Sequence, residues 1–257
     1  MKLSKLLVLL FVQYFLVLLM PGNVTAFCRQ RKLLPLPTPQ QITEIVKKLK
    51  ANTMECAFVF DLKTTTGKKT ETKTGKFYFQ RNDQVTNLRF DFANQSFLSL
   101  KEAKGEVFCS GKVTKMRWDD PIQEGHLLSF SDVLMPFLES GGEYCCQNRV
   151  QGRNTHIIRF KEDQGRVVNI AYDPVFEVVL QVEHFDEKGQ CVRTFKLLEF
   201  KKAQGTWFMK TIEIKSHDIT SQLIIKKIAL KQAIPAAIFN KNTLEQPNED
   251  RLTYIDF

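Results

Sequence analysis

The residues best suited to chemistry lie near position 185, where His184 stands beside Asp186 and Glu187. An imidazole next to two carboxylates is a set of groups that general acid–base catalysis and metal binding both use. The same residues also suit the end of a β-hairpin, because Asp186 can accept local backbone hydrogen bonds and Gly189 can adopt positive φ. Charged residues followed by glycine recur at 162–165, again between apolar runs. We therefore interpret this stretch as a turn between two strands.

The other histidines do not form a catalytic or metal-binding motif. His126, His156 and His217 have no partner ligand at the i, i+4 spacing of a helical metal site. Residues 216–218 read Ser-His-Asp, but the members of a catalytic triad meet in space from separate segments. The sequence also lacks the glycine motifs of nucleotide-binding sites and the G-x-S-x-G nucleophile elbow. It predicts a protein that is not an enzyme, with no catalytic residues, no metal and no cofactor.

The N-terminus has the pattern of an export signal. Lys2 and Lys5 precede an apolar run at 6–20, and Val24 and Ala26 provide small residues at the −3 and −1 positions. The apolar run is shorter than the roughly 20 residues of a membrane-spanning helix. We expect residues 1–26 to be a signal peptide that is cleaved after Ala26. Phe27 replaces the small residue that a lipoprotein signal places before its cysteine, which argues against a lipid anchor on Cys28 but leaves it open.

Charge and cysteine content restrict the partners and the compartment. The formal net charge is +9 without a long basic run, so together with the export signal it predicts no nucleic-acid partner. An even number of cysteines in an exported protein permits disulfides, although buried free thiols are an alternative. Their connectivity stays open, but two neighbours on a strand point to opposite faces, so 145 and 146 are not expected to bond each other. The cysteines are Cys28, Cys56, Cys109, Cys145, Cys146 and Cys191.

Apolar periodicity predicts a short helical start followed by many strands. A proline-rich leader at 27–40 precedes a helix at 41–51, whose residues Ile42, Ile45, Val46 and Leu49 share one face. Residues 127–139 again have a helical stripe, which Pro136 divides into one or two short helices. We expect a polar turn at 64–76 and a polar, loose tail at 240–257. The predicted strands are 58–62, 76–80, 88–92, 97–100, 106–110, 113–118, 144–150, 154–160, 167–171, 175–185, 191–200, 207–215 and 223–230.

Phenylalanine is unusually frequent, with 21 residues in the chain, and many occupy alternate positions of the predicted strands. These rings can form an ordinary aromatic core. They can also line the inner face of a curved sheet, which then holds apolar ligands in place of solid packing. The inner lining that we predict on this second interpretation is Phe58, Phe60, Phe90, Phe92, Phe208 and Ile212.

The order of these elements resembles the LolA-like family of outer-membrane lipoprotein-sorting proteins. The similarity extends over about 41–246, from the helix "ITEIVKKLK" through "SFSDVLMPFLESGGEYCCQNRV" to the strand–turn–strand run at 172–215. The resemblance implies an α+β, mainly β fold, in which an unclosed antiparallel half-barrel sheet wraps around one to three helices in a single domain at 41–239. The lid-holding arginine of LolA itself has no matching motif here, and the cysteines are not a family feature.

The family implies a periplasmic carrier that holds the acyl chains of lipids or lipoproteins in an apolar cavity and takes part in outer-membrane lipoprotein sorting. Release would follow from movement of the segment near 127–139. Transient membrane-protein donors and acceptors would be its partners, and the cargo and oligomeric state stay open. One alternative is an envelope-stress sensor with a LolA-like fold, although such regulators carry a second C-terminal domain. A hydrolase that uses His184, Asp186 or Glu187 is the less favoured alternative.

Overall fold

The computed structural model describes residues 34–50, 54–81, 86–100, 106–109, 116–117, 119–122, 124–162, 165–203, 206–230, 232–244 and 250–256. The predicted signal peptide, its cleavage site and Cys28 lie outside these residues. The first helix, α1 (Pro39–Lys50), begins at a capping box. The Gln41 amide donates to Thr38 Oγ1 (3.2 Å), while the Thr38 amide donates to Gln41 Oε1 (2.8 Å). Ile42, Val46 and Leu49 are buried on one face of the helix, as the sequence predicts.

The first half of the chain forms an antiparallel meander. Residues 64–76, predicted as a turn, instead extend two paired strands, and the chain reverses near Gly67, whose φ is +57°. Because this end of the hairpin projects beyond the core, its threonines and lysines are mostly exposed, which explains why hydropathy alone suggested a turn. The strands are β1 (Met54–Thr66), β2 (Lys69–Arg81), β3 (Thr86–Phe92), β4 (Gln95–Leu100), β5 (Glu106–Cys109) and β6 (Met116–Arg117).

The second half forms another antiparallel meander, close to the predicted boundaries. Its strands are β7 (Gly142–Val150), β8 (Arg153–Lys161), β9 (Val167–Asp173), β10 (Val178–Phe185), β11 (Cys191–Ala203), β12 (Thr206–Ser216) and β13 (Ile219–Leu230). The strand predicted to begin at 175 begins at Val178 instead, because residues 174–177 form a turn.

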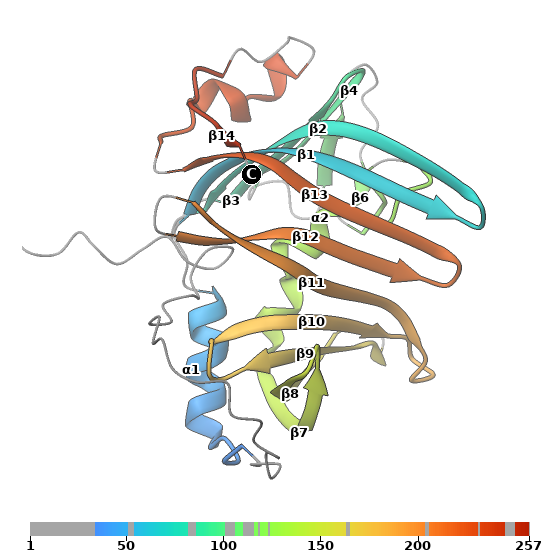
Figure 1. The fold of residues 1–257 in the computed structure, drawn as a ribbon, viewed down its shortest axis with the longest axis vertical. Helices are drawn as coiled ribbons and strands as arrows, with labels where there is room; N and C mark the ends of the chain where they lie inside the picture. Colours follow the sequence, from blue (N-terminus) through green and yellow to red (C-terminus); the bar gives the residue numbers. More distant parts are fainter. Residues whose placement is uncertain are drawn as a thin grey trace, which may run out of the picture.

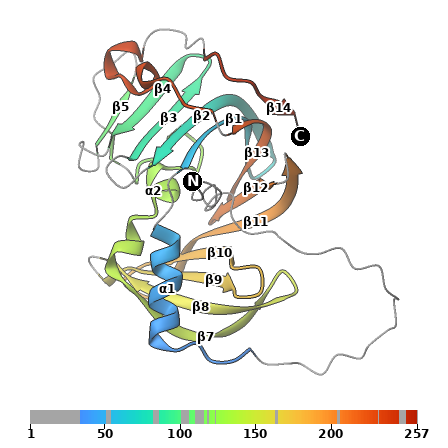
Figure 2. The ribbon, with the colours of Figure 1, turned by 90° about the vertical axis from the view of Figure 1, so that its left-hand side faces the viewer.

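The two meanders join into one sheet through the pairing of β1 with β13. The strand order is β6-β5-β4-β3-β2-β1-β13-β12-β11-β10-β9-β8-β7, so β6 and β7 end its two sides. The sheet twists and curves around the helices, as Figure 1 shows. In Figure 2, α1 lies across the β7–β10 side and α2 (Phe130–Leu134) lies between the two halves. This architecture confirms the predicted α+β, mainly β fold with an open antiparallel half-barrel.

A crossing segment, defined here as the described part of 119–141, connects the two end strands across the concave face. It contains an isolated bridge between Pro121 and Ser129, then α2, and then the 3-10 helix η2 (Pro136–Ser140). Met135 adopts φ +50° between the two short helices, so the predicted division at Pro136 is confirmed. The topology explains this cover, since a chain that leaves β6 must cross one face of the sheet to reach β7.

The apolar core lies mainly on the concave face. One large cluster combines the buried face of α1, Phe130 of α2 and Phe137 of η2 with inward side chains from both meanders. Two smaller clusters lie on the convex face. One joins Val150 and Ile157 to neighbouring strands, and the other contains Ala57 and Tyr78 beneath the C-terminus. No helix within the described residues has the length and apolarity needed to cross a membrane.

The C-terminal strap, defined as the described part of 232–256, packs on the convex face. It contains the 3-10 helices η4 (Ala236–Phe239) and η5 (Lys241–Thr243) and ends in β14 (Ile255–Asp256), which pairs with β13. Leu244, Leu252 and Tyr254 pack into the convex cluster. The expectation of a loose tail is therefore wrong for these residues. The polar composition is misleading because a few apolar side chains are enough to anchor a segment to an existing sheet.

Candidate functional site

Five of the six predicted lining residues belong to the concave apolar cluster. Phe60 packs edge-on against Phe90 and Phe92, with ring centroids 6.0 and 5.7 Å apart. Phe58 stacks on Phe77 at 5.5 Å, and Phe92 and Ile212 are partly exposed at the border of the cluster. Phe208 belongs to β12, but its side chain lies outside the described part of the structure. Five phenylalanine rings of the cluster form what we call the aromatic floor: Phe58, Phe60, Phe77, Phe90 and Phe92.

Phe130 of α2 covers this aromatic floor. Its ring meets Phe90 edge-on, with centroids 5.4 Å apart, and its side chain is fully buried. Because α2 has only five residues, its own backbone hydrogen bonds contribute little to keeping it in place. Contacts with the sheet must therefore hold Phe130 on the floor.

Arg193 of β11 clamps the crossing segment to the sheet. Its guanidinium donates to the Leu127 carbonyl and forms an ion pair with Asp132 Oδ2. Asp132 also accepts a hydrogen bond from the Ser129 amide (2.7 Å), which fixes the first turn of α2. One arginine thus holds both the approach to α2 and the helix itself.

A second polar contact holds the crossing segment at the β1–β13 junction. Thr64 Oγ1 lies 2.5 Å from His126 Nδ1 and 2.7 Å from Ser221 Oγ, and the Leu127 amide donates to Ser221 Oγ (3.2 Å). All three side chains are buried. Strand residues from the two meanders therefore bind the same short stretch of the crossing segment.

Both contacts leave polar atoms without partners. Asp132 Oδ1, Arg193 Nε and His126 Nε2 are buried and have no hydrogen-bond partner among the described residues. A buried polar group without a partner costs about 1–3 kcal/mol, so the closed position of the crossing segment is held less strongly than its contacts suggest.

Two titratable groups beside the clamp have shifted pKa values. Burial raises the pKa of Asp132 to about 6, although the Arg193 charge and the Ser129 hydrogen bonds act in the opposite direction. Burial, with the charges of Arg193 and Arg166, lowers the pKa of His184 to about 4. At neutral pH the clamp therefore contains a carboxylate that burial disfavours and an uncharged imidazole.

The hairpin interpretation of 182–200 is right for the turn and wrong for its histidine. Asp186 Oδ1 accepts hydrogen bonds from the Lys188 and Gln190 amides, and Gly189 has φ +75°. His184, however, points inward, with its ring 6.1 Å from Phe137 and 5.9 Å from Phe195. The alternation of β10 places His184 on the inner face with Val182, two residues before the turn begins.

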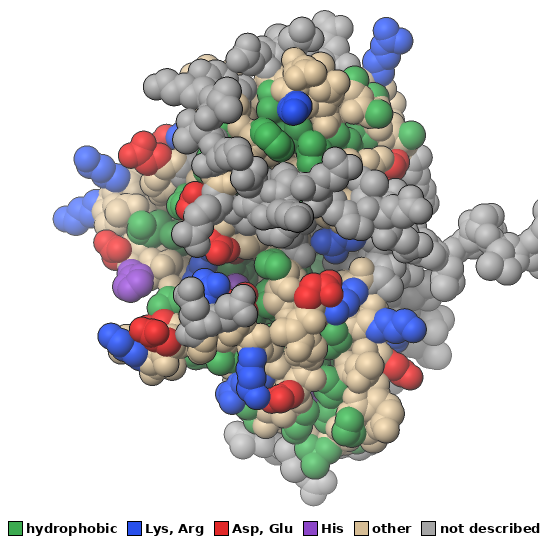
Figure 3. Space-filling model, turned by 180° about the vertical axis from the view of Figure 1, so that it is seen from behind, with side chains coloured by type: hydrophobic (Ala, Val, Ile, Leu, Met, Phe, Trp, Pro, Cys, Tyr) green, Lys and Arg blue, Asp and Glu red, His purple; other side chains and the backbone are tan. Residues whose placement is uncertain are grey.

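The structure does not bring the remaining sequence candidates together. His126 is buried beside Thr64, His156 packs against Tyr144 on the β7–β8 side, and His217 lies in the exposed turn between β12 and β13. Within the described residues, no group of three or more His, Cys, Asp or Glu side chains could hold a metal ion. On the face drawn in Figure 3, the described acidic and basic side chains are mixed, without a large area of one sign.

Sequence reasoning missed the clamp. Arg193 and Asp132 lie 61 positions apart, and neither belongs to a recognisable motif. The available signal was indirect. Arg193 lies two residues before Phe195, so both share one face of the strand, and an arginine on an inward face needs a partner.

Comparisons with known proteins agree on the fold. A family model described only as an uncharacterised protein matches residues 173–246, and no curated protein matches the chain. A domain from Vibrio parahaemolyticus named for outer membrane lipoprotein sorting is 14% identical with a TM-score of 0.69, and the match covers 81% of this chain and 100% of that one. A DUF1329 family protein from Desulfovibrio piger is 12% identical with a TM-score of 0.66, covering 80% and 98%.

A LolA superfamily protein from Nitrosomonas europaea has the same architecture. It is 12% identical with a TM-score of 0.61, and the match covers 81% of this chain and 100% of that one. At such low identity the likeness is one of fold, and it confirms the fold that the sequence pattern suggests. The chain therefore has a LolA-like fold, the fold of proteins named for outer-membrane lipoprotein sorting.

Proposed function

We propose that this protein is a non-enzymatic carrier that binds the acyl chains of lipids or lipoproteins on its concave face. The observation that carries the proposal is the aromatic floor, which is covered by a five-residue helix and not by a second sheet. The LolA-like fold and the names of its structural neighbours support it. With the predicted export signal, they support a periplasmic role in outer-membrane lipoprotein sorting.

In this proposal, the acyl chain takes the place of Phe130. The ring of Phe130 occupies the floor next to Phe90 in the closed protein. When the crossing segment moves away, the floor exposes several aromatic rings, and an acyl chain gains about 0.8 kcal/mol for each CH₂ that it buries there. Cargo and Phe130 therefore compete for one apolar surface.

The Arg193 clamp sets the balance of this competition. Opening breaks its contacts with Leu127 and Asp132, but it returns unpaired buried atoms of Asp132 and Arg193 to water. These opposing contributions keep the free-energy difference between the closed and open states small. A carrier needs such a small difference because it must both load and release its cargo.

Lipid analysis and a fluorescent fatty-acyl probe test the proposal. Protein purified from membrane-containing extract is expected to carry acyl lipids that mass analysis of the extract identifies. After delipidation it is expected to bind the probe. Failure to bind any acyl probe would contradict the carrier function, and selective binding of a protein segment in its place would favour the stress-sensor alternative.

Two matched variants localise the binding. Ile212→Glu places a charge at the border of the aromatic floor and is expected to weaken probe binding at least tenfold. Val175→Glu introduces the same charge at an exposed apolar residue in the turn before β10 and is expected to leave binding unchanged. Equal effects of both variants would rule out the concave face as the binding surface.

A further inference from the structure

Cys145 and Cys146 lie at a β-bulge in β7, which is an end strand of the sheet. Tyr144 is opposite Ile158 and Cys146 is opposite Ile157, so Cys145 has no opposing residue on β8. The bulge interrupts the alternation on which the expected opposite orientation of the two cysteines was based. Both residues are exposed, whereas Tyr144 packs inward against the concave cluster. Both cysteines are free in this structure, but the alternation argument against a bond between them does not hold at the bulge.

The two cysteines are neighbours in the chain, and both are free and exposed. Burial, a hydrogen bond with the Cys145 thiol and the charge of Cys145 together raise the pKa of Cys146. The nearby Arg159 guanidinium acts in the opposite direction and favours the thiolate. The pair thus combines adjacency at the bulge with access to solvent and a neighbouring cation, and the last two favour reaction of a thiolate.

We propose that Cys145 and Cys146 form a redox-active vicinal pair that closes to a disulfide by exchange with a disulfide oxidant, either a small-molecule or a protein disulfide. One cysteine thiolate attacks a sulfur of the oxidant, forming a mixed disulfide and releasing the first oxidant thiol. The second thiolate then attacks the mixed disulfide, forms the bond between Cys145 and Cys146 and releases the second oxidant thiol. The two cysteines lose two electrons and two protons, and the oxidant gains both.

The proposed disulfide is a reversible one and not a structural brace. Adjacent Cα atoms are about 3.8 Å apart, whereas disulfides usually join Cα atoms about 4.4–6.8 Å apart. A bond between neighbours therefore adds strain, closes no long loop and is easily reduced. The pair also follows Gly141 and Gly142, where the crossing segment ends and the chain returns to the sheet.

The test is a titration of the full-length mature protein in mixtures of reduced and oxidised glutathione, read by alkylation and peptide mass analysis. Both thiols are expected to become resistant to alkylation together, in a peptide that has lost two hydrogens and carries no glutathione. Strong excess of reduced glutathione should restore both. Glutathione adducts that persist on both cysteines of the unchanged chain, or a bond to another cysteine, would overturn the proposal.

Single variants separate the two steps of the exchange. Cys145→Ser and Cys146→Ser each lack the second thiolate, so each is expected to accumulate a stable mixed disulfide with glutathione on the remaining cysteine. Cys191→Ser removes another exposed thiol and should leave closure of the pair unchanged. Mixed disulfides that form no faster in the two pair variants than at Cys191 would contradict special reactivity at the bulge.

Discussion

The strap covers the convex face of the sheet and the crossing segment covers the concave face. Arg89 contacts the strap and Arg193 contacts the crossing segment, but the two arginines differ in burial and in where their partners lie. On the convex face, Arg89 is fully buried, pairs with Asp91 of its own strand (2.6 Å) and donates to the Ile238 carbonyl of the strap (2.9 Å). On the concave face, Arg193 is 19% exposed, and both of its partners belong to the crossing segment. Movement of the strap would leave the Arg89 ion pair intact, whereas movement of the crossing segment would break the contacts of Arg193 with both Leu127 and Asp132.

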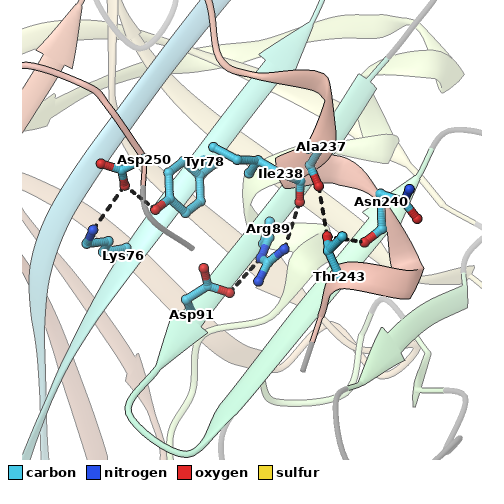
Figure 4. A network of polar contacts seen from close by, with 9 residues as sticks. All are labelled: Lys76, Tyr78, Arg89, Asp91, Ala237, Ile238, Asn240, Thr243 and Asp250. Atoms are coloured by element: carbon cyan, nitrogen blue, oxygen red, sulfur yellow. Dashed lines mark hydrogen bonds and ion pairs between the residues drawn. The ribbon is translucent and has the colours of Figure 1, made fainter. Parts of the chain in front are cut away.

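Asp250 of the strap and Asp132 of the crossing segment also differ, because their pKa values are shifted in opposite directions. Burial alone would raise the pKa of Asp250, but hydrogen bonds from Tyr78, Lys76 and Tyr254 outweigh it and lower that pKa. Figure 4 shows Asp250 with Lys76 and Tyr78 of β2, and Arg89 of β3 with the Ile238 carbonyl, the contacts that join the strap to these two strands. Asp132, in contrast, keeps a raised pKa and an unpaired oxygen.

In the proposed carrier, this difference assigns a structural role to the strap and a mobile role to the crossing segment. At neutral pH the strap holds an ionised carboxylate whose partners favour its charge, and its apolar residues pack against Ala57 and Tyr78 of the sheet. The crossing segment holds an ionised carboxylate whose burial is unfavourable. We infer that the strap unfolds with the whole domain and that the crossing segment opens on its own.

Loss of the convex arginine should have the largest effect. Arg89→Ala removes the ion pair with Asp91 and the hydrogen bond to the Ile238 carbonyl. Removal of one partner from a buried ion pair costs about 3–5 kcal/mol, so we expect a loss of that size in the free energy of unfolding. Urea denaturation measures it. A loss below about 1 kcal/mol would show that the strap contributes little to stability.

Loss of the concave arginine should act mainly on cargo exchange. Arg193→Ala removes hydrogen bonds between charged groups that typically contribute about 1.5–3 kcal/mol to the closed position. The open population should rise about tenfold or more, and acyl-probe exchange should accelerate to the same extent. Stopped-flow fluorescence measures the exchange rate. An Arg193→Ala protein that loses as much global stability as Arg89→Ala, with unchanged exchange, would remove the distinction between the two covers.

The pH dependence of opening should disappear in Asp132→Asn. The pKa of Asp132 is about 6 in the closed protein and returns toward 3.8 when the side chain is solvated. Between these values the closed form binds a proton that the open form releases, so falling pH favours closure. We expect probe exchange to slow on the order of tenfold across this window in the parent protein but not in Asp132→Asn. If the parent protein and Asp132→Asn show the same pH dependence of probe exchange, Asp132 does not control opening.

Replacement of His184 should have the smallest effect. Its pKa shift is opposite in direction to that of Asp132, so falling pH acts against the folded protein here. The pKa of His184 is lowered from 6.5 to about 4, so the unfolded chain binds a proton before the folded protein does. Stability is therefore present above pH 6.5 and is lost as the pH falls toward 4. His184→Gln should make this loss smaller by on the order of 1 kcal/mol. The variant also provides the background in which the Asp132 profile is measured without interference.

Sequence patterns predicted the local elements well because side-chain alternation reports directly on a half-buried strand. Leu88, Phe90 and Phe92 alternate with polar residues, and β3 has the predicted inner face. Pattern alone does not show which strands pair at a distance, and the β1–β13 junction joins the two ends of the domain. The Arg193–Asp132 contact depends on that junction and on the path of the crossing segment.

Two further features depend on single-residue details that periodicity does not contain. The bulge beside Cys146 leaves Cys145 without an opposite residue on β8, and nothing in the composition of β7 marks it. The strap is fixed by a two-residue strand and by Asp250, whose partners Lys76 and Tyr78 come from a distant strand. The alternation thus identified strands and apolar positions, while the contacts that hold the crossing segment and the strap required the structure.

Hydrogen exchange with and without a bound acyl lipid tests the central claim most directly. If cargo displaces the crossing segment, amides at 127–139 should lose protection on lipid binding, while those of the strap at 236–244 should keep theirs. The same pattern should appear, without lipid, in Arg193→Ala. Loss of protection in the strap, or no change in the crossing segment at saturating lipid, would contradict the proposed division between a mobile concave cover and a structural convex one.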